Sequence, residues 1–304
     1  MSKSFSIEEG RCNYNFMQLG TCWHLYSPEN YEIIFTGEAD FKAAMTLLAI
    51  CVCNFFSIRV LTFQIMNNHL HMVLCGPEED VFLMFRMFKK YLSLYLKADG
   101  RSVRLKEWEC KLRRIADLSD ARNVIAYNNR NGFLVNNDTS PYSYPWGANR
   151  YFFNTDIKSR VAEAGNKLTG KSIRTLFHTR ELDRFAGLVT LDGYVSPIAF
   201  CDIDAAEGLF RNASHYFYAV SKNQEAMRTV ASEIGENIFF SDSDLYMAVS
   251  TVSRDKYNVH NPSLLPVQAK IEVARMMRFE YNASPKQIAR MLKLDLANVT
   301  AIVQ

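Results

Sequence analysis

The chain has 304 residues, of which 48% are hydrophobic and 22% charged, with a formal net charge of +3. This balance is typical of an ordinary globular protein and excludes disordered, collagen-like and mini-protein classes. No apolar stretch follows a basic start, and the longest apolar run, residues 43–56, is shorter than the ~20 residues of a bilayer span. The seven cysteines lack zinc-ribbon spacing. We therefore expect a cytoplasmic protein with reduced thiols and no membrane partner.

Positive charge gathers in one central segment. Residues 86–130 carry 12 basic and 5 acidic side chains, whereas residues 1–85 carry 4 and 9. Such a segment is either a solvated helical face or a groove for nucleic-acid phosphates. In the second interpretation, the DNA-binding candidates are Arg86, Lys89, Lys90 and Lys97.

The first half of the chain alternates strand and helix patterns. Residues 20–26 and 58–74 are rich in aromatic and β-branched residues, and residues 38–56 between them have helical apolar spacing. Helical patterns follow at residues 81–96 and 119–130. This order predicts an α+β fold, a ferredoxin-like antiparallel sheet with helices on one face.

The second half has mainly helical patterns. They occupy residues 155–164, 203–220 and 242–253, after a loop-like tract at residues 136–151. We therefore expect three parts along the chain: an α+β domain at residues 1–153, a mainly helical middle region at residues 154–261, and a trihelix at residues 262–304.

The trihelix has the pattern of a helix-turn-helix. Its helices are expected at residues 267–279, 284–292 and 295–303, and Ser284 before Pro285 is a strong helix start. The usual turn glycine is replaced by Lys293. The segment is either a plain helical bundle or a reader of duplex DNA. In the second case its DNA-binding candidates are Lys286, Arg290 and Lys293.

Two histidines in the stretch MNNHLHMVL, residues 66–74, give the strongest chemical signal. Alternation along a strand places His69 and His71 on one face, about 7 Å apart, and Leu70 on the other. Two imidazoles at this spacing can bind one divalent ion, with a third ligand from another element. The alternative is a polar pair at a solvated sheet edge. The apolar flanks favour a central strand, where uncompensated imidazoles are costly.

A second group of polar residues lies in the stretch IAYNNRN, residues 125–131. On a helix, Tyr127 and Asn131 project from one face, about 5–6 Å apart at Cβ. A phenol, with a reference pKa of about 10, is a weak nucleophile, but beside a divalent ion it can attack a phosphodiester. The alternative is a tyrosine that packs in a core or an interface.

The stretch GNKLTGKS, residues 165–172, fits the phosphate-loop pattern G-x-x-x-x-G-K-S. That pattern binds phosphate only where it connects a buried strand to a helix. The preceding residues 158–164 are charged and helical, and Asp192 with Gly193 is typical of a hairpin turn. We interpret the match as a coincidence and retain a phosphate-loop NTPase as the weakest alternative.

In combination, these signals resemble the REP-associated branch of the single-tyrosine transposases, in the His-hydrophobic-His nuclease superfamily. The resemblance covers residues 15–153 and depends on the order of four motifs. They are MNNHLHMVL, the basic aromatic helix with Phe88-Lys89-Lys90-Tyr91, IAYNNRN, and the closing segment Tyr144-Pro145-Trp146. The resemblance implies that His69, His71 and Asn131 bind Mg²⁺ or Mn²⁺ and that Tyr127 is the nucleophile.

The resemblance also implies an activity. It is the nicking and strand transfer of single-stranded, hairpin-forming DNA through a 5′-phosphotyrosine, as in DNA transposition, by a homodimer. The trihelix would add binding of duplex DNA. The alternative is a DNA-binding regulator derived from such a transposase, with a silent nuclease site.

Overall fold

The computed structural model describes residues 15–29, 31–101, 103, 105–135, 142, 144–167, 169, 171, 185, 187–222, 224–236, 240 and 242–303. The chain forms two compact units, Met1–Val230 and Ala231–Gln304. The first contains a four-stranded sheet, and the second is helical. Within the described residues, no helix is both long and apolar enough to cross a bilayer.

A four-stranded antiparallel sheet in the order β2-β3-β1-β4 forms the core of the first unit. Its strands are β1 Cys22–Tyr26, β2 Arg59–Ile65, β3 Leu70–Cys75 and β4 Lys111–Arg114. The strand tract expected at residues 58–74 is a hairpin, and His69 lies just before β3. β3 is buried along its whole length. The predicted α+β class and the antiparallel sheet are confirmed, whereas β4 was not predicted.

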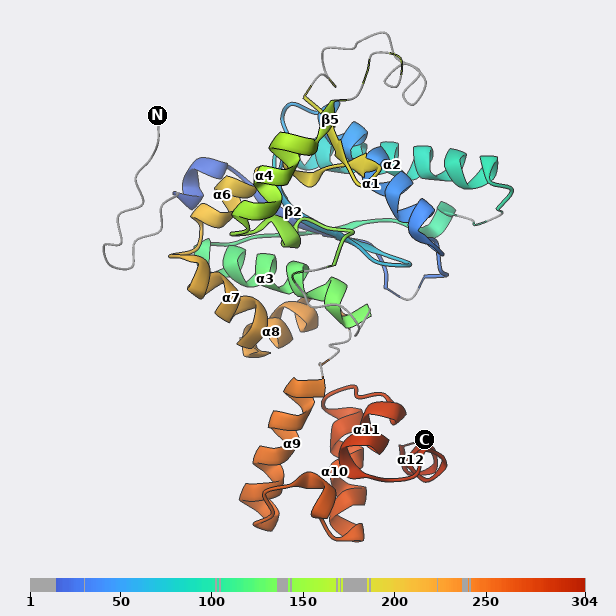
Figure 1. The fold of residues 1–304 in the computed structure, drawn as a ribbon, viewed down its shortest axis with the longest axis vertical. Coiled ribbons are helices and arrows are strands. Elements are labelled where there is room, and N and C mark those ends of the chain that lie inside the picture. The colour runs from blue at the N-terminus through green and yellow to red at the C-terminus, as the bar shows by residue number, and fades with distance from the viewer. Residues whose placement is uncertain are drawn as a thin grey trace. The chain divides into compact units, whose positions relative to one another are not determined.

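Helices cover both faces of this sheet (Figure 1). α1 Glu38–Cys53 and α2 Glu78–Ala98 lie on one side, and α3 Leu118–Val135 packs against β2 and β3 on the other. The expectation of helices on one face is therefore wrong. The reason is that both sides of β2 and β3 are buried, so the sheet needs a helical layer on each face.

The segment Tyr144-Pro145-Trp146 closes the open edge of β2. The backbone N–H of Ile65 donates to the carbonyl of Trp146 at 2.8 Å, and the Tyr144 hydroxyl donates to the carbonyl of Ile65 at 2.7 Å. The Trp146 ring stacks on the ring of Phe41 in α1, with centroids 5.0 Å apart. These contacts occupy a strand edge that would otherwise be open to pairing with another chain.

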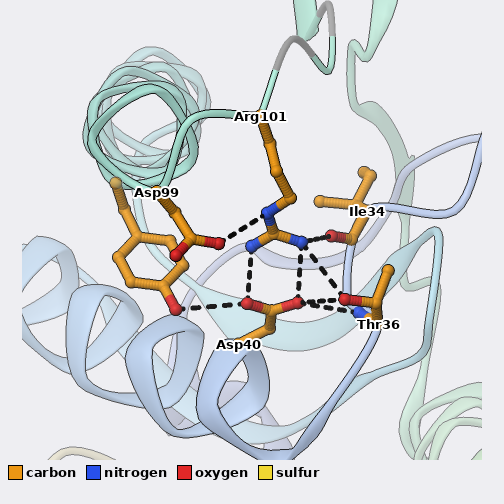
Figure 2. A network of polar contacts seen from close by, with 6 residues as sticks. Ile34, Thr36, Asp40, Asp99 and Arg101 are labelled. Atoms are coloured by element: carbon orange, nitrogen blue, oxygen red, sulfur yellow. Dashed lines mark hydrogen bonds and ion pairs between the residues drawn. The ribbon is translucent and has the colours of Figure 1, made fainter.

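A polar network ties the start of α1 to the end of α2 (Figure 2). Arg101 donates to both carboxylate oxygens of the buried Asp40, at 2.5 and 2.8 Å, and the Tyr95 hydroxyl donates to Asp40 at 3.1 Å. Burial would raise the pKa of Asp40, but hydrogen bonds from Arg101 and Thr36 outweigh it and lower that pKa. The network therefore stabilises the fold above the ordinary carboxyl pKa, and this contribution is lost as the pH falls through the lowered value.

The next part of the chain contains further helices and a small sheet. Its elements are α4 Thr155–Ala164, β5 Asn166–Lys167, β6 Val189–Leu191, β7 Tyr194–Val195, α6 Ile203–Gly208, α7 Ala213–Lys222 and α8 Gln224–Ile234. β5, β6 and β7 pair in that order, and α7 packs along α3. The helix expected at residues 203–220 is in fact two helices, and α8 was not predicted.

After α8, which ends at Ile234, the second unit contains four α-helices in its described residues. They are α9 Asp242–Tyr257, α10 Val267–Phe279, α11 Pro285–Leu292 and α12 Leu296–Val303. Ser284 caps α11 in a capping box with Gln287, and Lys293 ends α11 in the left-handed conformation, with φ of 51°. Val299 is fully buried in the core of the unit. The helices of the trihelix are thus where the sequence predicts them, and its role as a helix-turn-helix stays a prediction.

Cys22 and Cys75 lie directly opposite each other in β1 and β3 and form a disulfide. The expectation of reduced thiols is wrong for this pair. The two residues are 53 positions apart and meet only through strand pairing, so their spacing in the sequence does not reveal the bond.

Candidate active site

Four rings from three separate parts of the sequence meet on the α3 side of the sheet. His24 belongs to β1, His69 lies just before β3, His71 belongs to β3, and Tyr127 belongs to α3. The Tyr127 ring centroid lies 5.8 Å from that of His71 and 6.1 Å from that of His24. One ring nitrogen of His69 lies within 4.8 Å of one ring nitrogen of His71. The structure therefore brings the sequence-predicted histidine pair and the sequence-predicted tyrosine together.

All four rings are buried. The exposed fraction is 0% for His24 and His71, 5% for Tyr127 and 9% for His69. The alternative interpretation of the histidines as polar residues at a solvated sheet edge is therefore wrong. The four rings are therefore largely shielded from solvent.

Each histidine of the pair has a protein partner at Nδ1. His69 Nδ1 lies 2.7 Å from the Asn68 side-chain oxygen, and His71 Nδ1 lies 3.1 Å from His24 Nε2. Contacts of this kind decide which nitrogen of an imidazole is available to a metal ion.

Asn131 is the third metal ligand that the resemblance implies. It follows Tyr127 by one turn of α3 and is half-buried. Residues four apart on a helix share a face, so the Asn131 amide projects from the same side as the tyrosine ring. Its part in metal binding stays a prediction.

A buried polar network holds α3 against the sheet. The Asn129 side-chain oxygen accepts a hydrogen bond from the Thr62 hydroxyl, and the Asn129 amide donates to the Tyr216 hydroxyl of α7 at 2.8 Å. The Gln64 amide donates to the backbone carbonyl of Asn129 at 2.9 Å. These bonds fix the helix two residues from Tyr127, so the position of the tyrosine over the histidines is set within its own chain.

Sequence reasoning missed His24 and Asn129. The sequence nevertheless contains a feature that could have identified each of them. His24 stands between Trp23 and Leu25 in an apolar strand, where a buried imidazole needs a polar partner. Asn128 and Asn129 stand side by side in a helix interior, where asparagine is unfavourable unless its side chain finds a hydrogen bond.

The basic residues of α2 lie away from the four rings. Arg86, Lys90 and Lys97 are exposed and, at spacings of four and seven residues, share one stripe of the helix. Lys89 is half-buried and pairs with Glu109. α2 lies on the side of the sheet opposite α3 (Figure 1), so the helix that carries these four residues is on the other side of the sheet from Tyr127.

The basic candidates of the trihelix lie at its surface. Lys286 and Arg290 are exposed one turn apart on α11, and Lys293 is exposed at the end of that helix. Arg290 forms an ion pair with Asp242 of α9. Lys286 and Lys293 are therefore the stronger candidates for contact with a DNA phosphate.

The phosphate-loop match at residues 165–172 follows helix α4 rather than a strand. Its residues 166–167 form β5, which pairs with β6, while residues 168, 170 and 172 lie outside the described residues. Asp192 lies in the turn between β6 and β7, as predicted. The described part of the match thus lacks the buried strand that must lead into a phosphate loop.

No protein-family model matches this sequence, and no curated protein matches it. Among solved structures, the chain is similar to a REP-associated tyrosine transposase bound to a REP hairpin. The identity is 15% and the TM-score 0.35, over 48% of this chain and 86% of the other. A likeness this distant carries no argument about function, which depends instead on the arrangement of the side chains.

Proposed function

We propose that the protein is a metal-dependent enzyme that nicks single-stranded DNA and transfers the strand through a 5′-phosphotyrosine on Tyr127. The observation that carries the proposal is the placement of Tyr127 beside the His69 and His71 pair within one chain. The order β1-α1-β2-β3-α2-β4 supports the ferredoxin-like arrangement expected for this class.

The side chains at the site fit a divalent ion. His69 and His71 offer two imidazoles whose Nδ1 atoms already have protein partners, and Asn131 would add an amide oxygen. Imidazole ligands suit Mn²⁺ better than Mg²⁺, which prefers oxygen and keeps its waters. When bound, such an ion polarises a non-bridging phosphate oxygen and offsets developing charge.

Tyr127 supplies the nucleophile in this proposal. Its phenolic oxygen forms a bond to phosphorus while the bond from phosphorus to the 3′ oxygen breaks. The phenolic proton passes to solvent, and the departing 3′ oxygen takes up a proton to become a hydroxyl. The phosphotyrosine keeps the energy of the ester, so a second 3′-hydroxyl can displace Tyr127 without ATP.

One chain supplies both the tyrosine and the histidine pair. α3 is hydrogen-bonded to β2 and α7 of the same first unit. The homodimer implied by the resemblance is therefore not needed to bring Tyr127 to His69 and His71.

The activity is tested by incubating the full chain with Mn²⁺ and end-labelled, single-stranded hairpin DNA. We expect a covalent protein–DNA adduct on a denaturing gel and a free 3′-hydroxyl on the released fragment. DNA binding without an adduct at any hairpin would support the silent regulator instead. ATP hydrolysis in the absence of DNA would support the NTPase.

Replacement of either metal-binding histidine is expected to abolish cleavage. His69→Ala and His71→Ala should each reduce adduct yield by at least about 100-fold, because the remaining ligands hold a divalent ion weakly against water. The matched control is His215→Ala, which removes an imidazole on α7. Adduct formed by either site variant at the wild-type level in the presence of EDTA would contradict the metal assignment.

The trihelix is expected to bind duplex DNA independently of cleavage. Lys286→Ala combined with Lys293→Ala should weaken duplex binding and reduce the salt slope by about 0.9 per lost phosphate contact, while adduct formation on a short single strand stays unchanged. Substitutions are preferable to deletion of residues 262–304, because α9 packs against those helices. Fluorescence anisotropy at several salt concentrations measures both quantities.

The control for this experiment is Lys256→Ala combined with Arg275→Ala, which removes the same charge from α9 and α10. An equal loss of duplex affinity in both double variants would show that duplex binding depends on net charge and not on the α11 surface. An unchanged affinity in the α11 variant would identify the trihelix as a packing element.

A further inference from the structure

We propose that His24 and Asn68 are positioning residues that fix the tautomers of His71 and His69, so that both rings present Nε2 to one metal ion. The inference depends on the proposed metal site and names the groups that act on its ligands. It is carried by the two Nδ1 contacts and by the hydrogen bonds that hold Asn68 in place.

Asn68 is held in a single orientation. Its side-chain amide nitrogen donates to the backbone carbonyls of Glu29 and Tyr31, the latter at 3.0 Å. The indole N–H of Trp108 donates to the backbone carbonyl of Asn68 at 3.1 Å. Because the amide nitrogen is engaged in this way, the Asn68 side-chain oxygen is the atom that faces His69.

An amide oxygen can only accept a hydrogen bond. His69 must therefore carry its hydrogen on Nδ1, which lies 2.7 Å from the Asn68 oxygen. In a neutral imidazole the lone pair is then on Nε2. Asn68 thus selects the tautomer of His69 that binds a metal through Nε2.

His24 acts on His71 across paired strands. The register pairs Tyr26 with His71 and His24 with Val73, so His24 is the diagonal neighbour of His71 on the same face of the sheet. Their rings are stacked with centroids 5.3 Å apart, and both residues have an exposed fraction of 0%. The two rings are therefore fixed partners in a position that bulk water does not reach.

The hydrogen bond between these two rings can run in either direction. When His71 donates from Nδ1 to Nε2 of His24, the lone pair of His71 is on Nε2 and can bind a metal. When His24 donates instead, the hydrogen of His71 is on Nε2 and blocks that ligand position. Metal binding through Nε2 is compatible only with the first arrangement, in which His24 is the acceptor.

The tautomers can be measured directly on the wild-type chain. Long-range proton–nitrogen correlation spectra of the full protein labelled with ¹⁵N-histidine, at a pH where the imidazoles are neutral, distinguish Nδ1–H from Nε2–H rings. We expect His24, His69 and His71 all to carry hydrogen on Nδ1. A hydrogen on Nε2 of His71 or His69 would overturn the proposal, and this measurement needs no variant.

Substitution of His24 and Asn68 tests the same proposal through Mn²⁺ affinity, measured by calorimetry. His24→Phe keeps an aromatic ring but removes the acceptor, and it should weaken Mn²⁺ binding by about 10–100-fold. His24→Gln supplies a carbonyl oxygen at this position and should restore most of the affinity. Asn68→Ala should weaken binding as His24→Phe does. Wild-type affinity in His24→Phe, or no recovery in His24→Gln, would contradict the positioning role.

The outcomes separate this inference from the proposed function. If the wild-type chain binds Mn²⁺ with the expected tautomers but forms no DNA adduct, the nuclease proposal fails and the positioning role stands. If the adduct forms while His71 carries hydrogen on Nε2, the positioning role alone fails. A wild-type chain that binds no Mn²⁺ overturns both.

Discussion

The Tyr127→Phe variant is expected to give a yield of covalent adduct with single-stranded DNA at least about 10³-fold below that of the wild type, while its Mn²⁺ affinity stays close to the wild-type value. The reason is that the phenolic oxygen is the atom that bonds to phosphorus. The phenylalanine ring keeps the edge contacts that Tyr127 makes with His24 and His71. End-labelled DNA on a denaturing gel measures the adduct.

Tyr26→Phe is the matched control for this prediction. Tyr26 is half-buried on β1, and its ring stacks on that of His71 with centroids 6.4 Å apart. It is thus a second phenol beside the same histidine, and its loss should leave adduct yield nearly unchanged. An undiminished adduct in Tyr127→Phe would exclude Tyr127 as nucleophile, and loss of the adduct only in Tyr26→Phe would identify Tyr26 in its place.

The parts of the candidate site that could be predicted are those encoded locally. His69 and His71 stand out because they are two residues apart in an apolar stretch, and this spacing alone places them on one face of a strand. Tyr127 and Asn131 share a helix face by the same kind of argument. That these two groups form one site was implied only by the resemblance of the motif order to that of a known family.

The partners of these residues could not be predicted, because they depend on contacts between distant segments. His24 lies 47 residues from His71, and Tyr216 lies 87 residues from Asn129. No periodicity in the sequence links such positions. The pairing of β1 with β3 and the packing of α7 on α3 create both contacts.

The boundaries of the helices after residue 200 show how one side chain can override a regular pattern. The apolar spacing at residues 203–220 predicts one helix, but the structure has two. The side chain of Asn212 accepts a hydrogen bond from the backbone N–H of His215 at 2.8 Å, which is the contact of an N-cap. Asparagine thus starts a new helix, α7, and this helix carries Tyr216 to Asn129.

The Asn129→Leu variant is expected to lose about 2–4 kcal/mol of unfolding free energy. Leucine cannot accept from the buried Thr62 hydroxyl or donate to the buried Tyr216 hydroxyl, so both bonds are lost at a position that is fully buried. The three tryptophans, at positions 23, 108 and 146, all belong to the first unit. Urea denaturation followed by their fluorescence therefore reports on this unit.

Asn128→Leu provides the control, because it makes the same change at the neighbouring position of α3. Asn128 is also fully buried, but its side-chain amide makes no hydrogen bond within the described residues. An apolar group of similar size removes a desolvation cost there, so stability should stay unchanged or rise by about 1 kcal/mol. Equal losses of unfolding free energy in the two variants would mean that the shape of leucine, and not the loss of hydrogen bonds, causes the destabilisation. The hydrogen bonds of Asn129 would then not be what holds Tyr127 over the histidines.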